Sequence, residues 1–311
     1  MRWSQMFAPT LRDDPAEADA PSDRLLLRAG YVRRLAPGHY TLLPLAVRVR
    51  AKIIGIVRAE LDAIGAQEML LPAPHPAEPS RRSEIFATVA RELNSYRQLP
   101  QRWFQFQTTF RNEPRPKGGL MRTREFTLKD AYSFDIDRPG LDASFDAFHG
   151  AYARIFERLG IPVLPCEAAG GTLGGAGSTE FMSPSDVGED LVVRCAGCGY
   201  AADIECATSV SAPAADVPGL PSPERFDTPG VRTIEDLVAF DAPADRQIKT
   251  LVYILDGTLT LVLLRGDHPL NERKLADATG AAALRPADPA EIQDALGALP
   301  GSLGAVGVSL P

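Results

Sequence analysis

The chain has 311 residues, which is long for a single domain and indicates two. Hydrophobic residues make up 45% of it and charged residues 23%, a balance typical of a globular protein with a buried core. This composition excludes a disordered tail, a collagen-like chain and a coiled coil. The formal net charge of -7 gives no overall positive field, so we expect no DNA binding, and any nucleic-acid contact has to come from a local basic patch.

No segment has the pattern of a membrane span or an export signal. The longest apolar runs, such as residues 259–264, are far shorter than the roughly 20 residues that cross a bilayer. The N-terminal stretch has no apolar run of signal-peptide length ahead of its charges. We therefore expect a cytoplasmic protein without membrane contact.

A long amphipathic helix is predicted over residues 44–65. Apolar residues recur there at intervals of three and four and so share one helix face: Val49, Ile53, Val57, Leu61 and Ile64. Gly65 is a natural end, because glycine adopts the left-handed conformation without strain. A short strand over 67–71, a proline-rich loop over 73–82 and a helix over 84–96 are predicted to follow.

A β-hairpin with a long charged loop is predicted next. Phe104, Phe106 and Phe110 alternate at period two, which indicates a strand over 103–110 with these rings on one face. Residues 124–134 are predicted to be the return strand. The connection between them contains two prolines and two adjacent glycines and cannot be regular.

The remaining elements divide the chain into domains. A helix over 137–159, ended by Gly160, and a buried strand over 161–166 precede the glycine-rich run 170–177. Beyond the proline-rich stretch 209–229, the Asp256-Gly257 pair predicts a hairpin between strands over 250–255 and 258–265. Helices are predicted over 233–240, 271–279 and 289–298. We thus expect a first domain over 1–208, a linker over 209–229 and a second domain over 230–311.

The charged loop is the clearest chemical signal. Between residues 111 and 129 the chain has six basic residues and two acids, a net charge of +4 inside a chain of -7: Arg111, Arg115, Lys117, Arg122, Arg124, Lys129, Glu113 and Glu125. Arginine binds phosphate through two parallel hydrogen bonds, so this pattern indicates an anion site. Glu113, two residues after Arg111, is expected on the same sheet face, where its carboxylate would accept from an amino group. Phe126 offers a flat ring for a base, and a solvated charged hairpin is the alternative.

These residues carry a resemblance to a known family. Phe110-Arg-Asn-Glu113, followed by the glycine-containing loop, Met121-Arg-Thr-Arg-Glu-Phe126 and Lys129-Asp-Ala-Tyr-Ser-Phe134, resembles motif 2 of class II aminoacyl-tRNA synthetases. The amino-acid sequence of this motif is most similar to that of bacterial-type prolyl-tRNA synthetases. Gly65-Ala-Gln-Glu-Met-Leu-Leu-Pro72 resembles motif 1. The resemblance implies an α+β fold, with an antiparallel sheet flanked by helices, and a homodimer formed through motif 1.

The resemblance also implies roles for individual residues. Arg111 would hold the α-phosphate of ATP, and Glu113 would accept from the adenine amino group. Phe126 would stack on the adenine, while Arg122 would reach the outer phosphates together with Mg2+. Arg115 and Lys117 would meet the acceptor end of tRNA(Pro). These implied roles make Arg111, Glu113 and Arg122 the candidate catalytic residues.

A proline pocket is implied by six further positions that match the family: Tyr132, Phe134, Gly174, Gly175, Ser178 and Glu180. Paired glycines let the backbone approach a small ring closely. Tyr132 and Phe134 are equally consistent with ordinary core aromatic residues.

The sequence also departs from the family pattern. The family carries a Gly-Pro-Thr-His-Glu-Glu segment whose two glutamates are expected to bind the imino group of proline. Here that segment is absent, and Arg82 and Ser83 stand about where the glutamates would be. Thr179 replaces a histidine common in the family. Nothing after Glu180 resembles motif 3 or an anticodon-binding domain, so we expect either a fragment or a reduced paralogue.

The C-terminal block resembles the start of the editing domain inserted in bacterial prolyl-tRNA synthetases. The matching stretches include Ile248-Lys-Thr-Leu251 and Arg265-Gly-Asp-His268. The resemblance implies that Lys249, with Asp267 and His268, takes part in hydrolysing mischarged alanyl-tRNA, in a partial α/β domain. Judged by chemistry alone, Lys249 is an exposed charge at a strand start and His268 a surface turn residue.

The Cys195-x-x-Cys198 pair, with Cys206 nearby, suits a zinc knuckle by spacing. A structural zinc site needs four ligands, however, and a second pair is missing. Reduced cytosolic thiols are the preferred interpretation, and we predict no metal site.

Two functions stay open on the sequence. The first is a proline–tRNA ligase that activates proline with ATP and transfers it to tRNA(Pro), carrying part of an editing domain. The alternative is a catalytically reduced synthetase-like module that binds nucleotide or tRNA, or edits, without ligating. Motifs 1 and 2 favour the first, and the missing glutamates and motif 3 favour the second.

Overall fold

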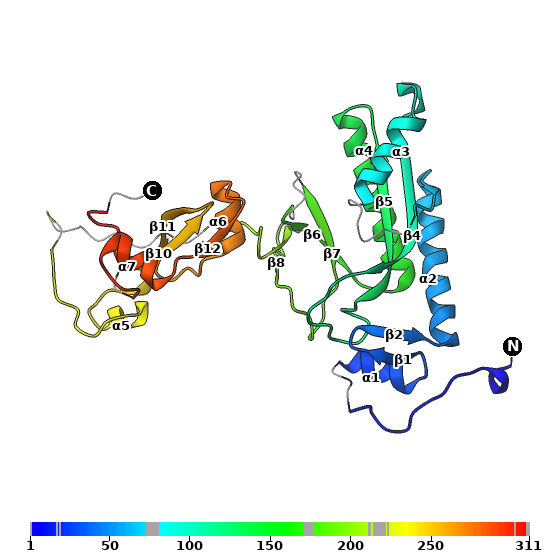
Figure 1. The fold of residues 1–311 in the computed structure, drawn as a ribbon, viewed down its shortest axis with the longest axis horizontal. Coiled ribbons are helices and arrows are strands. Elements are labelled where there is room, and N and C mark those ends of the chain that lie inside the picture. Colours follow the sequence, from blue (N-terminus) through cyan, green and yellow to red (C-terminus); the bar gives the residue numbers. More distant parts are fainter. Residues whose placement is uncertain are drawn as a thin grey trace. The chain divides into compact units, whose positions relative to one another are not determined.

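The computed structural model describes residues 2–16, 18, 20–72, 81–170, 177–210, 213, 222, 224–301 and 303–308, and the side chains of 81–84 lie outside this description. The chain divides into two compact units (Figure 1). The first comprises Met1–Leu164 with Phe181–Gly188, and the second Pro165–Glu180 with Glu189–Pro311. Among the described residues, no helix combines the length and the apolar character that crossing a membrane requires.

A three-stranded sheet forms the centre of the first unit. Strand β4 (Gln101–Phe110) lies between β3 (Gln67–Glu68) and β5 (Glu125–Phe134). It runs parallel to β3 and antiparallel to β5, with Gln101 opposite Phe134 and Phe110 opposite Glu125. This register fixes which side chains share each face of the sheet.

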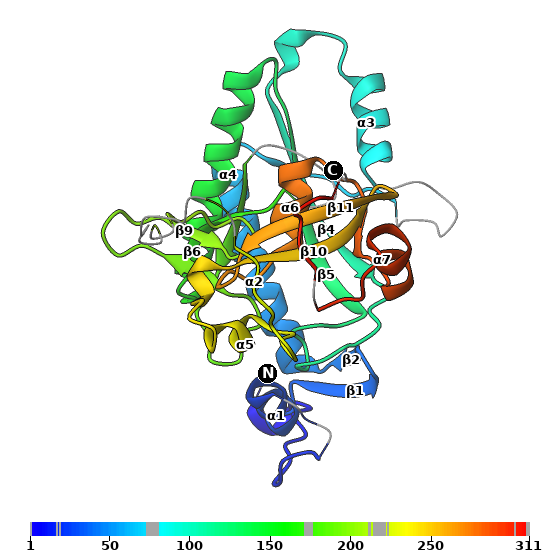
Figure 2. The ribbon, with the colours of Figure 1, turned by 90° about the vertical axis from the view of Figure 1, so that its left-hand side faces the viewer.

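Two long helices cover one face of this sheet (Figure 2). Helix α2 (Pro44–Ala63) and helix α4 (Arg138–Leu159) bury Leu61 and Ala151 against Phe104 of β4. Phe106 and Ala131 pack against this cluster. Because side chains alternate along a strand, the even-numbered residues of β5 from Phe126 to Phe134 point to the opposite face, away from the two helices.

Local signals in the sequence account for the ends of helix α4. The Asp137 carboxylate accepts from the backbone N–H of Gly140 at 2.9 Å, and a proline follows in the first turn. Gly160 ends the helix in the left-handed conformation, with φ 70°. Helix α3 (Arg81–Glu92) and a 3-10 turn, η2 (Tyr96–Gln98), precede β4.

An N-terminal hairpin lies beside the sheet. It consists of β1 (Val32–Ala36) and β2 (His39–Leu42), and it follows η1 (Trp3–Gln5) and helix α1 (Pro21–Arg28). Leu27, Val32 and Ala46 form its buried cluster, which joins α1, β1 and α2.

Two further sheets follow along the chain, and all of their residues except Leu164, Phe181 and Met182 belong to the second unit. Strands β6 (Leu164–Ala168), β7 (Ser178–Met182), β8 (Val192–Arg194) and β9 (Ala201–Asp203) pair in the order β7-β6-β9-β8. The other sheet has the order β11-β10-β12, from β10 (Ile248–Leu255), β11 (Thr258–Arg265) and β12 (Leu284–Pro286). The helical segments of the second unit are α5 (Ile234–Val238), η4 (Ala244–Arg246), α6 (Glu272–Thr279) and α7 (Pro289–Leu296).

Most predicted elements are confirmed. The predicted helices over 44–65 and 137–159 correspond to α2 and α4, and the hairpin at Asp256-Gly257 is present, with positive φ angles of 47° and 85° at the turn. The predicted strand over 67–71 is wrong in extent, because only Gln67–Glu68 pairs with β4. Most of the predicted linker and glycines 174 and 175 lie outside the described residues. The domain boundary at 208/209 stays a prediction.

Candidate functional site

The loop between β4 and β5 is held in a defined shape by backbone hydrogen bonds. The N–H of Arg111 donates to the carbonyl of Arg124 at 2.8 Å, which extends the hairpin beyond Phe110. Lys117 and Arg122 exchange two backbone hydrogen bonds of 3.2 Å across the loop tip. Gly118 and Gly119 turn the chain there with φ of 65° and 64°, angles that favour glycine.

Arg111 and Phe126 lie against each other at the start of this loop. The guanidinium carbon of Arg111 is 5.0 Å from the centroid of the Phe126 ring, a cation–π distance. The Arg111 side chain is exposed, and Phe126 is half-buried on the sheet face away from α2 and α4. An exposed cation beside an accessible flat ring suits a ligand that combines a phosphate with an aromatic base.

Glu113 makes its contacts within the loop. Its carboxylate accepts from the Nε of Arg122 at 2.8 Å and from the backbone N–H of Arg115 at 3.0 Å. These two donors, with Arg122 the stronger, hold the pKa of Glu113 below its usual value, so the side chain is an ionised acceptor. Glu113 does not continue the predicted strand alternation, because β4 ends at Phe110 and the N–H of Glu113 donates to the carbonyl of Arg111 in a tight turn.

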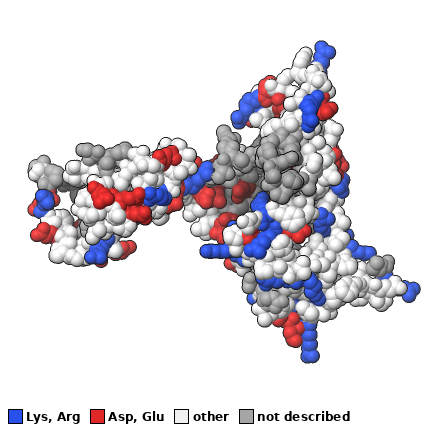
Figure 3. All heavy atoms as spheres, viewed as in Figure 1, with Lys and Arg blue, Asp and Glu red and all other residues white. Residues whose placement is uncertain are grey.

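The structure therefore brings together the four residues predicted for nucleotide binding. Arg111 with Phe126, and Glu113 with Arg122, form two contacting pairs at the loop end of the β4–β5 hairpin. Arg115 and Lys117 are exposed on the same loop. Figure 3 shows Lys and Arg side chains (blue) on the visible surface of the first unit.

The aromatic residues predicted for the proline pocket lie on the same sheet face as Phe126. Tyr132 and Phe134 are partly buried, and the Phe134 ring lies 5.4 Å from that of Trp103 and 6.2 Å from that of Phe86. Ser178 and Glu180 belong to β7 in the second unit. Gly174, Gly175 and the side chains of Arg82 and Ser83 lie outside the described residues.

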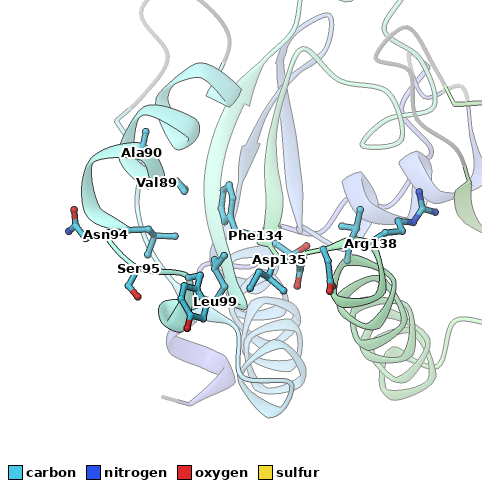
Figure 4. Close-up of a pocket in the computed structure, with 14 residues that line it drawn as sticks. Val89, Ala90, Asn94, Ser95, Leu99, Phe134, Asp135 and Arg138 are labelled. Carbon is cyan, nitrogen blue, oxygen red and sulfur yellow. The ribbon is translucent and has the colours of Figure 1, made fainter.

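A cavity of about 880 Å³ opens at the far end of β5, away from the loop. Phe134 and Asp135 line it from β5 and the residue after it, Val89 and Leu93 from α3 and the residue after it, and Leu141 from α4 (Figure 4). The Asp135 carboxylate accepts from the Ser144 hydroxyl at 2.6 Å. Of the predicted pocket residues in the described region, only Phe134 lines this cavity.

The predicted editing residues meet at one end of the β10–β11 hairpin. The Lys249 amine donates to the carbonyl of Gly266 at 3.3 Å. Arg265 donates two hydrogen bonds to Asp267, at 2.6 and 2.8 Å, and its guanidinium also lies 2.9 Å from the Nε2 of His268. The Arg265 guanidinium keeps the pKa of Asp267 below its usual value. Sequence reasoning missed Arg265, although its place three residues before His268 is visible in the sequence.

The Cys195–Cys198 segment forms a tight turn between β8 and β9. Cys195 donates its N–H to the carbonyl of Tyr200 at 2.8 Å and accepts at its own carbonyl from Gly199 at 3.1 Å. Hydrogen bonds from the backbone and thiol of Cys198 lower the pKa of Cys195. In the part of the chain that the structure describes, no three His, Cys, Asp or Glu side chains are grouped to hold a metal ion.

Sequence reasoning also missed the environment of Lys129. Its amine donates to the Tyr152 hydroxyl at 2.5 Å and lies 4.2 Å from the centroid of that ring. Burial lowers the pKa of Lys129 to about 8 and raises that of Tyr152 to about 12. The odd position of Lys129, on the strand face that also carries Ala131, was the signal that it points toward the helices.

Comparisons with known proteins match two families along the chain. Residues 78–212 match the family described as tRNA synthetase class II core domain (G, H, P, S and T). Residues 228–311 match the family described as aminoacyl-tRNA editing domain.

Similar curated proteins are proline–tRNA ligases of bacteria. The chain is 51% identical to that of Anaeromyxobacter sp. (strain Fw109-5), over 99% of this chain and 59% of the relative, and 43% identical to that of Solidesulfovibrio magneticus, over 100% and 60%. It thus spans about three fifths of the length of these relatives. The second alignment runs over 342 residues against the 311 of this chain, so about 31 aligned positions have no counterpart here.

Two solved structures of prolyl-tRNA synthetase from Cryptosporidium parvum are also similar. The one complexed with halofuginone and AMPPNP has a TM-score of 0.46 at 17% identity, covering 51% of this chain and 40% of that chain. The one complexed with L-proline and AMP has a TM-score of 0.45 at 18% identity, covering 51% and 38%. From the curated relatives and the two matching domains, the chain belongs to the bacterial-type prolyl-tRNA synthetases, a family of class II aminoacyl-tRNA synthetases.

Proposed function

We propose that this chain works in proline–tRNA ligation, activating proline with ATP and transferring it to tRNA(Pro). The observation that carries the proposal is the meeting of Arg111, Phe126, Glu113 and Arg122 at one end of the β4–β5 hairpin. These four side chains supply what ATP needs: a ring for the base, an acceptor for its amino group and two cations for its phosphates.

In the proposed reaction the proline carboxylate attacks the α-phosphorus of ATP. The P–O bond to pyrophosphate breaks, and prolyl-adenylate forms with pyrophosphate as the leaving group. The guanidinium of Arg111 stabilises the negative charge that develops on the α-phosphate oxygens. The terminal ribose hydroxyl of tRNA(Pro) then attacks the activated carbonyl carbon and releases AMP.

Mg2+ belongs to the proposal as a companion of ATP. The described residues contain no group of three acidic or metal-ligating side chains, so they do not form a protein cage for the ion. Mg2+ commonly binds through substrate phosphates with few protein ligands. The ion would therefore arrive on the triphosphate, next to Arg122.

The remaining roles are proposed for residues outside the ATP site. Arg115 and Lys117 on the loop would neutralise phosphates of the tRNA acceptor end.

The proline pocket is proposed to be formed by Tyr132, Phe134, Ser178 and Glu180, together with Gly174 and Gly175. Lys249, Asp267 and His268 are proposed to hydrolyse mischarged alanyl-tRNA. A homodimer through motif 1 and a cytoplasmic location complete the proposal.

Proline-dependent exchange of labelled pyrophosphate into ATP tests the proposed function. We expect exchange that needs proline and is abolished in Arg111→Ala. Binding of ATP without exchange would instead identify a module that binds nucleotide without ligating. Absence of ATP binding would overturn both assignments.

A further inference from the structure

Arg124 connects three segments of backbone around the proposed ATP site. Its N–H donates to the carbonyl of Gly38 at 2.9 Å, and its Nη1 donates to the carbonyl of Pro37 at 3.4 Å. Its Nε donates to the carbonyl of Glu113 at 2.9 Å. Since the Arg124 carbonyl also accepts from Arg111, one residue joins the β1–β2 turn, the loop and the end of β4.

The β1–β2 turn meets the loop without space between them. Gly38 has φ of 77°, and a Cβ built on it would lie 2.9 Å from the Cβ of Pro116 and 3.0 Å from the backbone nitrogen of Arg124. Contacts below about 3.0 Å require something to move, so only glycine lets the two backbones approach this closely. The turn is therefore fitted to the loop.

The charge of Arg124 is directed at carbonyl oxygens. Its side chain donates hydrogen bonds to the carbonyls of Glu113 and Pro37. At the same junction, the Nδ1 of His39 lies 3.6 Å from the Glu125 carboxylate. A planar guanidinium that bonds two backbone segments fixes their separation, which a single flexible ammonium cannot do as well.

We propose that Arg124 is a positioning residue that, with the Pro37–Gly38 turn, holds the loop so that Glu113 faces the adenine. The Glu113 backbone is fixed by Arg124 from one side, and its carboxylate is oriented by Arg122 and the N–H of Arg115. An ionised carboxylate accepts from the amino group of adenine and repels the carbonyl oxygen at the same place on guanine. Arg124 thereby contributes to the choice of ATP over GTP, a consequence that rests on the proposed function.

The positioning itself is tested without any ligand. Hydrogen exchange of the amides of residues 111–124 is measured in wild type, Arg124→Gln and Arg124→Lys. We expect hydrogen exchange in the loop to accelerate by roughly 10- to 150-fold in Arg124→Gln, the range for losing a charged hydrogen bond, and less in Arg124→Lys. The matched control is Arg102→Gln, because Arg102 likewise donates to a carbonyl, that of Ile64 at 2.9 Å, at the other end of β4. Loop exchange unchanged in Arg124→Gln, or equally fast in Arg102→Gln, would overturn the proposal.

The consequence for the base is tested by equilibrium binding of ATP and GTP. We expect Arg124→Gln to reduce the ratio of ATP to GTP affinity about tenfold, with partial recovery in Arg124→Lys. A purely structural defect lowers the fraction of competent protein and leaves this ratio unchanged. If hydrogen exchange in the loop is faster but the ratio of ATP to GTP affinity is unchanged, Arg124 positions the loop without contributing to base selection, and that part of the proposal is overturned. Wild type that binds neither nucleotide would refute the proposed function, while the exchange result would still decide the positioning.

Discussion

The guanidinium carbon of Arg111 lies 5.0 Å from the centroid of the Phe126 ring, so two residues proposed to bind ATP contact each other directly. An adenine that stacks on Phe126 has to replace this contact. A cation–π pair at an exposed site contributes about 0.5–1 kcal/mol, less than the charged hydrogen bonds that a phosphate would offer Arg111. The nucleotide can therefore displace the pair.

Arg111→Ala is expected to weaken ATP binding by about 1.5–3 kcal/mol, roughly a tenfold to 150-fold rise in Kd. The reason is the loss of a charged donor to the α-phosphate. Isothermal titration with ATP and Mg2+ measures it. Arg28→Ala is the control, since Arg28 pairs with Asp14 on the exposed surface outside the site. Equal affinity of wild type and Arg111→Ala would refute the nucleotide assignment.

Glu113 gives a prediction for pH. Arg122 and the N–H of Arg115 hold its pKa below the ordinary 4.5, so the carboxylate stays ionised as pH falls through that value. We expect ATP affinity attributable to Glu113 to be constant from pH 8 to pH 5. Arg122→Ala removes the main donor, so its loss of affinity should begin at higher pH. Binding titrations extended from pH 8 down to pH 4 measure this, and loss of affinity at the same pH in both proteins would count against the assignment.

The sequence predicts the local elements well and the loop's contacts poorly. Period-two spacing places Phe104 and Phe106 in the core, where Phe104 is fully buried and Phe106 packs beside it. The same spacing fails at Glu113, since the strand ends three residues earlier. Strand β1 was not predicted, because its two arginines interrupt the alternation of apolar and polar residues that indicates a strand.

The contact between Arg124 and Pro37 could not be predicted, because it joins residues 87 positions apart. No local propensity encodes such a contact. The resemblance to motif 2, in contrast, predicted that four residues share one nucleotide site: Arg111, Glu113, Arg122 and Phe126. The structure places these residues at the same end of the β4–β5 hairpin.

Gly119 allows a test of how tightly the loop is packed. A Cβ on Gly119 would lie 2.5 Å from the Oδ1 of Asp23, a buried residue of α1, while one on Gly118 would meet only the Met121 side chain at 3.3 Å. Both glycines have φ near 65°, so alanine strains both backbones alike. We expect Gly119→Ala to lower the free energy of unfolding by about 1–3 kcal/mol more than Gly118→Ala. Urea denaturation measures the difference, and equal losses would mean that Asp23 gives way.

Lys129 makes stability depend on pH. Its pKa is about 8 in the folded chain and 10.5 ordinarily, so between these values the unfolded chain binds more protons and the free energy of unfolding rises with pH. Tyr152, with a pKa of about 12, acts in the opposite sense above pH 10. We expect the rise between pH 8 and 10 to disappear in Lys129→Met and to persist in Lys52→Met, where the lysine is exposed. Urea denaturation at each pH measures it, and a rise retained in Lys129→Met would assign it to another group.

The last prediction concerns the second unit. Arg265 holds Asp267 by two hydrogen bonds and lies 2.9 Å from the His268 ring, next to the carbonyl that accepts from Lys249. If these residues hydrolyse alanyl-tRNA, Lys249→Ala should slow deacylation by a factor of about 10²–10⁴, the range for a proton-transfer group. Arg265→Ala should slow it less, and Arg265→Lys should recover part of the loss, because Arg265 orients its neighbours. Arg285→Ala is the matched control, since Arg285 makes a similar pair of bonds to Glu291, at 2.6 and 2.8 Å, in the same unit. Release of labelled alanine measures the rates. Wild-type rates in Lys249→Ala would remove this cluster from the chemistry, and equal losses in Arg265→Ala and Arg285→Ala would reduce Arg265 to a stabilising residue.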